Sequence, residues 1–153
     1  MQHHRMSFLL TAAACALAVA PVVTRAGLGA DSRSIDADRQ QLKATLHTRE
    51  ASRYIVHELQ LPGGTVVREF VAPSGVVFAV AWQGPFMPNL RQMLGEHFDA
   101  YQSAARARRA GHRYVSVLQP DLVVRSAGHQ RAFSGQAYLP RLLPAGVTSE
   151  ELR

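Results

Sequence analysis

Residues 54–82 read YIVHELQL, PGG, TVVREFVA, PSG and VVFAVAW in succession. Three runs rich in Val, Ile, Phe and Tyr are separated by two short turns that contain Pro and Gly, a pattern typical of antiparallel strands joined by hairpins. This stretch predicts a three-stranded β-meander, and we expect the rest of the chain to pack around it.

The charged residues of the stretch predict how its first two strands pair. A three-residue loop at 62–64 would place Glu58 opposite Arg68 and His57 opposite Glu69, so that opposite charges face each other. We expect both pairs to be structural ion pairs, with Glu58 and Arg68 partly buried. The alternative for His57 and Glu69 is a tuned acid or base.

Both faces of the predicted meander are largely apolar, so both need cover. A second three-residue loop at 73–75 would set Phe70 opposite Phe78, and alternation along the strands would then gather Tyr54, Phe70, Phe78 and Trp82 on one face. We expect a helix to cover this face. A binding surface made by these aromatic side chains is the alternative.

Helices are predicted on both sides of the meander. Ser34 can cap a helix over about 35–47, followed by a linker to residue 53. Pro88 suits the first position of a long amphipathic helix, because apolar residues recur from there at helical spacing up to about residue 109.

The C-terminal third returns to the strand pattern. Short strands are predicted at 114–118, 122–126 and 132–139, and Thr148 with Glu151 resembles a capping box for a last turn. The fold class that follows is α+β: an antiparallel meander packed with one long amphipathic helix, with further antiparallel strands at the C-terminal end.

Residues 1–26 have the pattern of a secretory signal peptide. A short polar, partly basic start precedes an apolar stretch, and small residues allow cleavage after Ala26. We therefore expect a single α+β domain over 27–153 in the periplasm or the medium; a retained anchor is the alternative. Cys15 is the only cysteine and lies in the signal, so the mature domain would be free of disulfides.

The charge of the chain is basic and comes almost entirely from arginine. Lys and Arg number 17 against 11 Asp and Glu, for a formal net charge of +6, and Lys43 is the only lysine. Nucleic acid is the usual partner of such a chain, but an exported protein seldom meets it. We expect an envelope component or another protein as partner, and no membrane span after the signal is cleaved.

Candidate site residues come from the aromatic face and from the loop after it. Two prolines in QGPFMPN (83–89) would hold Phe86 and its neighbour Trp82 in place, which suits binding, although the two rings could simply fill the gap between sheet and helix. The binding candidates are Trp82, Phe86, Tyr54, Phe70 and Phe78.

The sequence contains little that indicates catalysis. A hydrolase-like site could use His57 with Glu69 or His129 with Asp121, but no nucleophile motif accompanies either pair. The histidines after residue 26 lack metal-ligand spacing, and no nucleotide-binding motif is present, so we expect no metal and no cofactor.

The meander, extended through QGPFMPNLRQMLG, and the later run DLVVRSAGHQRAFSGQAYLPRLLPAGV resemble an uncharacterised family of short exported proteobacterial proteins, known only as a domain of unknown function. The resemblance implies bacterial export and a common fold, and supplies no activity. The interpretation that fits best is a small non-enzymatic binding or accessory module. The hydrolase-like enzyme is the alternative, and a structural envelope protein is a third possibility.

Overall fold

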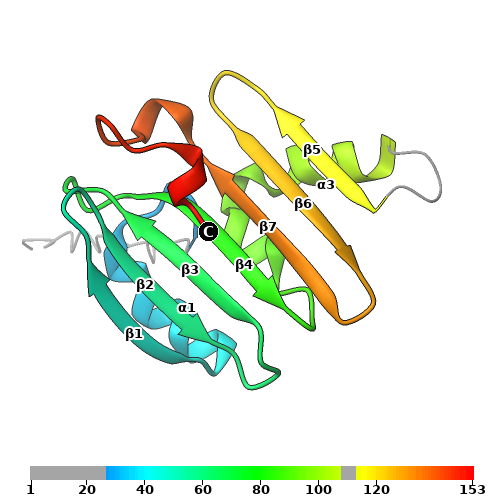
Figure 1. The fold of residues 1–153 in the computed structure, drawn as a ribbon, viewed down its shortest axis with the longest axis horizontal. Helices are drawn as coiled ribbons and strands as arrows, with labels where there is room; N and C mark the ends of the chain where they lie inside the picture. The colour runs from blue at the N-terminus through cyan, green and yellow to red at the C-terminus, as the bar shows by residue number, and fades with distance from the viewer. Residues whose placement is uncertain (1–26, 108–112) are drawn as a thin grey trace, which may run out of the picture.

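The computed structural model describes residues 27–107 and 113–153, which form one antiparallel sheet with helices on one of its faces (Figure 1). The predicted signal peptide lies outside the described residues, as does the end predicted for the long helix. The α+β class is confirmed. The strands are β1 (Thr45–Glu50), β2 (Ile55–Gln60), β3 (Val66–Val71), β4 (Val77–Gly84), β5 (Tyr114–Leu118), β6 (Val123–His129) and β7 (Ala132–Tyr138).

All seven strands join in a single sheet in the order β1-β2-β3-β4-β7-β6-β5. The meander supplies one half, and the C-terminal strands supply the other. The last strand, β7, lies beside β4, so that the two halves meet at a pair of strands far apart in sequence (Figure 1).

Strand β1 corrects the prediction of a helix over 35–47. Helix α1 (Ile35–Leu42) follows a 3-10 turn at Ser32–Ser34 and ends at Lys43, whose backbone is left-handed with a φ of 52°. The N–H of Lys43 donates hydrogen bonds to the carbonyls of Arg39 and Gln40, and the helix ends there. The chain then reverses and pairs with β2 as an exposed edge strand, in place of the predicted linker.

The register predicted for β2 and β3 is confirmed: Glu58 faces Arg68, and His57 faces Glu69. The register predicted for β3 and β4 is wrong, because Phe70 lies opposite Ala79 and Phe78 is an extra residue at a β-bulge.

The bulge reverses the two faces of β4. Val80 and Trp82 turn toward the helices, and Ala79 and Ala81 occupy the opposite face, which we call the open face. A residue added to one strand shifts every later side chain of that strand to the other side of the sheet.

The second helical segment is interrupted, so the expectation of one long helix is also corrected. It consists of α2 (Leu90–Leu94), a 3-10 turn at Gly95–His97 and α3 (Phe98–Ala107). Asn89 caps α2 by accepting a hydrogen bond from the N–H of Gln92 at 3.3 Å, so Pro88 lies before the helix and not at its first position. Gly95, with a φ of 53°, allows the change of direction.

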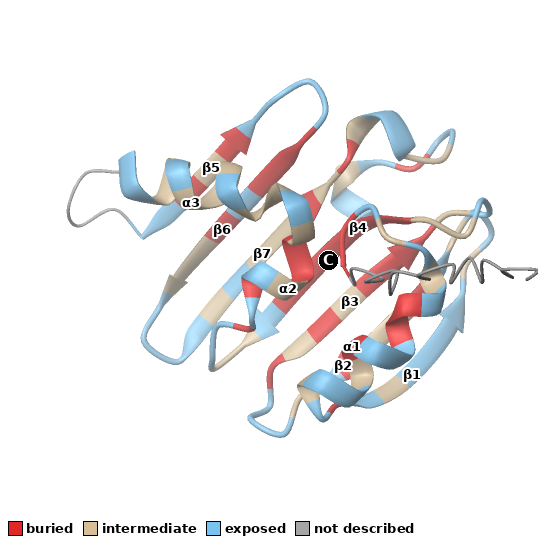
Figure 2. Cartoon of the chain, turned by 180° about the vertical axis from the view of Figure 1, so that it is seen from behind, coloured by how far each residue is buried: buried red, intermediate tan, exposed pale blue. Residues whose placement is uncertain are grey.

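The core has two parts, one on each side of the sheet. The larger part lies between the helices and the sheet, and Figure 2 shows α1, α2 and α3 over this face. The smaller part lies on the open face, where Val147 and Leu152 of the C-terminal segment pack against Phe70, Phe78 and their neighbours. The predicted capping box forms there, with the N–H of Thr148 donating to Glu151 Oε1 at 2.9 Å.

None of the described helices combines the length and the apolar character needed to cross a bilayer.

Candidate functional site

The open face carries a polar row that crosses the whole sheet. The register aligns one residue from each strand in this row: His47, Glu58, Arg68, Ala81, Gln136, Arg125 and Ser116. The C-terminal segment covers the aromatic end of the face and leaves the end near β5 and β6 uncovered (Figure 1). A sheet face that is not covered by a helix is therefore available to a ligand along part of its length.

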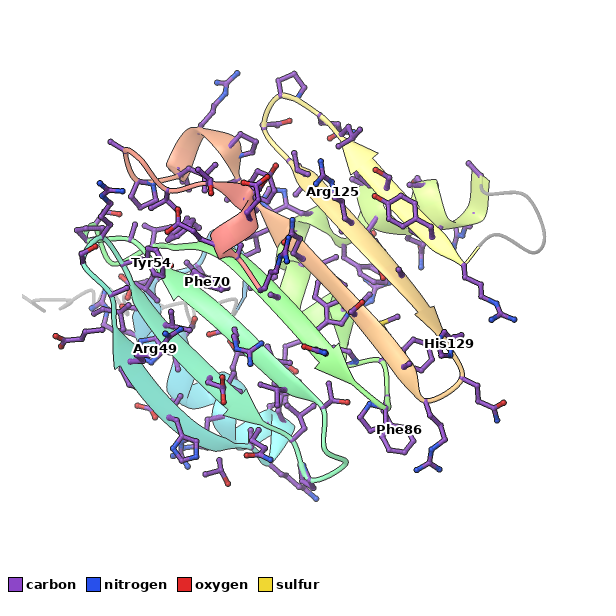
Figure 3. The ribbon with its side chains drawn as sticks, in the orientation of Figure 1. Arg49, Tyr54, Phe70, Phe86, Arg125 and His129 are labelled. Atoms are coloured by element: carbon purple, nitrogen blue, oxygen red, sulfur yellow. The ribbon has the colours of Figure 1, made fainter. Side chains whose placement is uncertain are left out.

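A hollow of about 320 Å³ lies over this row. Its floor is made of small side chains, including Ala81, Ala127 and Ser134. Arg68, Arg125 and the C-terminal Arg153 stand around it, and Tyr114 of β5 closes one side while remaining 50% exposed. Figure 3 shows Arg125 on β6, within the uncovered part of the face. The lining includes these three arginines and no Asp or Glu residue.

Arg68 is the only one of these three arginines that forms an ion pair within the described residues. Its Nε lies 2.9 Å from Glu58 Oε2, with 25% and 37% of the two side chains exposed. The predicted pair is confirmed, but such exposure limits its contribution to about 1 kcal/mol. The described residues place no acidic partner at Arg125, whose guanidinium therefore faces the hollow without a counter-charge.

His57 and Glu69 are cross-strand neighbours but form no ion pair in the described part of the chain. The His57 ring shares a hydrogen bond of 3.0 Å with Thr48 Oγ1, and burial lowers the pKa of His57, which favours the neutral ring. Glu69 is 1% exposed and points under α1, where its carboxyl group meets that of Asp38. The expectation of an ion pair is corrected, because each side chain finds another partner.

A buried polar cluster thus connects the sheet to α1 and α2. Gln92 of α2 donates through Nε2 to Asp38 Oδ1, and the carboxyl groups of Asp38 and Glu69 are neighbours. Asp38 Oδ2 and Glu69 Oε2 are buried and have no hydrogen-bond partner among the described residues. A proton held between the two carboxyl groups would satisfy both oxygens.

The charge state of the cluster follows from its burial. Removal from water and the neighbouring Asp38 raise the pKa of Glu69 to about 8, and burial also raises the pKa of Asp38. Glu69 is therefore protonated near neutral pH and acts as a hydrogen-bond donor. Because both groups are closed off from solvent, we assign this cluster to the stability of the fold and not to binding.

Comparison with known proteins identifies the family. Residues 24–152 match the family model described as "Protein of unknown function (DUF2844)". The chain belongs to this family. No curated protein and no solved structure was found to match it.

The five aromatic residues that the sequence suggested for binding are separated in this DUF2844 domain. Tyr54 makes edge-on contacts with Phe70 at 5.7 Å and with Phe78 at 5.9 Å, and the latter two rings are buried beneath the C-terminal segment. Trp82 is 2% exposed and packs on the helix side. Phe86 is 56% exposed, so it alone of the five presents most of its side chain to solvent.

The loop that carries Phe86 is held firmly by a buried threonine. Thr65 Oγ1 donates to the carbonyl of Phe86 at 2.8 Å and accepts from the N–H of Phe86 at 3.2 Å. Gly84 fits against Thr65 so closely that a Cβ there would overlap its backbone. Phe86 is therefore presented at a fixed place, beyond the end of β4 (Figure 3).

A second hollow, of about 460 Å³, adjoins the first. The two hollows share Gln83, Ala127 and Ser134 in their linings, and the second reaches His129 and Arg131 at the β6–β7 turn. Together they form one groove along the open face, which we call the open-face groove.

The catalytic alternatives gain no geometric support from the DUF2844 domain. Asp121 precedes β6 and His129 ends it, so the two lie at opposite ends of a strand. Glu69 is buried and His57 contacts Thr48, which leaves that pair without access to a substrate. Among residues 27–107 and 113–153, no group of three or more His, Cys, Asp or Glu side chains could hold a metal ion.

Sequence reasoning missed two residues that matter here. Arg125 interrupts the apolar run LVVRSA, and a charge in the middle of such a strand is a sign of an exposed face. Asp38 shares the apolar side of α1 with Ile35 and Leu42, at helical spacing, which is a sign of a buried polar contact. Neither signal identifies the partner of the residue.

Proposed function

We propose that this chain is an exported, non-enzymatic binding module, and that the open-face groove accepts a ligand with an anionic group. The observation that carries the proposal is the lining of the first hollow, which includes Arg68, Arg125 and Arg153 and no Asp or Glu. Arg68 is paired with Glu58 beside the hollow, whereas Arg125 has no acidic partner among the described residues. Guanidinium groups match carboxylate and phosphate groups in shape and charge. A hollow of about 320 Å³ is within the size range of ligand sites.

The composition of the groove supports binding and not chemistry. Its floor includes alanine, serine and glutamine side chains, its other lining residues include Trp82, Tyr114 and Leu152, and the histidine of the lining, His129, is at the far end from Arg125. A reaction needs an acid, base or nucleophile within reach of the bound group. The groove offers donors for an anion, and its arginines stay charged at any physiological pH.

Substitution of Arg125 tests the anion site. We expect Arg125→Gln to weaken the binding of inorganic phosphate and of succinate at least tenfold, because a charge-assisted hydrogen bond is lost. Nuclear magnetic resonance titration at low ionic strength, following the backbone amides of β6 and β7, measures the affinity.

Arg49→Gln is the matched control for that measurement. Arg49 lies on the edge strand β1, so the substitution removes the same charge from outside the groove (Figure 3). The control should bind both anions as the unmodified protein does. Equal affinities for Arg125→Gln and Arg49→Gln would show that net charge, and not the groove, attracts the anions.

Export has a separate test. The partly basic start, the apolar stretch and the small residues before Gly27 support removal of residues 1–26. When the full sequence is produced in a bacterium, we expect an intact mass that corresponds to a chain starting at Gly27. A product that keeps Met1 and stays in the cytoplasm would contradict export.

A further inference from the structure

The open-face groove has a cationic group near each end. Arg125 stands at the first hollow, and His129 and Arg131 line the second. Arg125 and His129 belong to the same strand and are separated by four residues, so they lie on the same face, roughly 13 Å apart along β6. Figure 3 shows the two side chains at separate points along this strand.

The floor between the two ends of the groove is uncharged, because the two hollows share Gln83, Ala127 and Ser134. Ala127 lies midway between Arg125 and His129 on the same face of β6. Ser134 and Gln83 continue the row across β7 and β4, and no carboxylate side chain lines either hollow. One ligand can therefore extend from Arg125 to the end lined by His129 and Arg131 without passing an acidic side chain of the lining.

An extended peptide has the spacing that this groove requires. In a β-conformation, side chains at positions i, i+2 and i+4 point the same way, and those at i and i+4 are roughly 13 Å apart. Acidic residues at i and i+4 would span from Arg125 to His129, at the end of the groove that Arg131 also lines, with a small residue at i+2 over Ala127. The peptide backbone would remain above the floor, where water satisfies its polar groups, and the Gln83 and Ser134 side chains could donate to it.

We propose that the open-face groove binds an extended segment of a partner protein that carries acidic side chains four residues apart. This inference rests on the proposed function, since it assigns the anionic ligand of the same groove to a peptide and adds a second anchoring point. Two anchors on one ligand raise its affinity because binding at the second site becomes intramolecular. Two anchors at a fixed distance also make the groove selective for the spacing of the acids.

Two capped pentapeptides of identical composition test the spacing. Glu-Ser-Thr-Ser-Glu carries its acids at i and i+4, and Glu-Glu-Ser-Thr-Ser carries them side by side. By isothermal titration calorimetry at low salt, we expect the first peptide to bind the full domain at least fivefold more tightly. Equal affinities would overturn the two-anchor inference.

Substitution at the second anchor locates the effect. Arg131→Gln should abolish the preference for the first peptide and leave the weaker affinity of the second unchanged. Retention of the preference in Arg131→Gln would overturn the assignment of the second anchor. If neither peptide nor inorganic phosphate binds, both this inference and the proposed function fail; if phosphate binds at Arg125 without any spacing preference, only this inference fails.

Discussion

Replacement of Glu69 by glutamine should remove most of the decline in stability that the protein shows between about pH 5 and pH 8. The pKa of Glu69 is raised from 4.5 to about 8 in the folded state, so folding holds a proton that the unfolded chain releases within this window. The free energy of unfolding therefore falls as the pH rises through the window, on the order of 1 kcal/mol per pH unit, and the contribution is lost above pH 8. Asp38, whose pKa is also raised, acts in the same direction.

Glutamine imitates the protonated carboxyl group without titrating. Its amide can donate to Asp38 in place of the shared proton, so Glu69→Gln should match the unmodified protein near pH 5 and exceed it by several kcal/mol at pH 8. Urea denaturation at a series of pH values measures the difference. Glu50→Gln, at an exposed position on β1, is the control and should leave the slope as it is. A Glu69→Gln variant with the same slope as the unmodified protein would show that Glu69 is ionised in the fold.

Substitution of Gly135 by alanine is expected to destabilise the fold by about 3 kcal/mol, although it adds a single methyl group. Gly135 on β7 lies directly opposite Trp82 on β4. A Cβ at this position would overlap the indole ring, lying 2.6 Å from Cε2 of Trp82, and would be 2.7 Å from the carbonyl oxygen of Arg125. Trp82 is buried on all sides, so a shift of the ring or of the backbone would cost packing energy.

A double-mutant cycle separates the clash from a general effect on β7. In a Trp82→Phe background the six-membered part of the indole is absent, so Gly135→Ala should cost at least about 1 kcal/mol less than in the unmodified protein. Ser134→Ala, at the exposed neighbouring position, should change the unfolding free energy by under about 0.5 kcal/mol. Denaturant midpoints at constant pH give all four values. A cost for Gly135→Ala that is independent of residue 82 would mean that the indole is not the obstacle.

The sequence was sufficient where local signals determine the structure. The β2–β3 register followed from the length of the loop at 62–64 and from the complementary pair Glu58 and Arg68, which are ten residues apart. The strands after residue 113 were predicted from their apolar and β-branched composition and from the turn residues that separate them. Strand β1 was missed because Leu46 is its only large apolar residue, and its place in the sheet comes from pairing with β2.

The parts that could not be predicted depend on contacts made across the fold. From the sequence, Phe70 could lie opposite Phe78 or opposite Ala79. The β-bulge places it opposite Ala79, and packing on both sides of the sheet favours that bulge. Asp38 and Glu69 meet only because α1 lies across the meander. The groove depends on the pairing of β7 with β4, and no local sequence pattern predicts this pairing. Arg68 and Arg125 therefore could not be placed on one face from the sequence.

The placement of β7 has a consequence for the order in which the chain can fold. Strand β4 is almost wholly buried, yet its neighbour on one side is a strand that starts 48 residues after β4 ends. Until β7 has been synthesised and brought back, the most apolar strand of the meander presents an unpaired edge, which is a template for aggregation. Folding must therefore await the closure of a long loop, and such closures slow folding. A chaperone that keeps the chain extended until residue 138 is available would protect this edge during the interval.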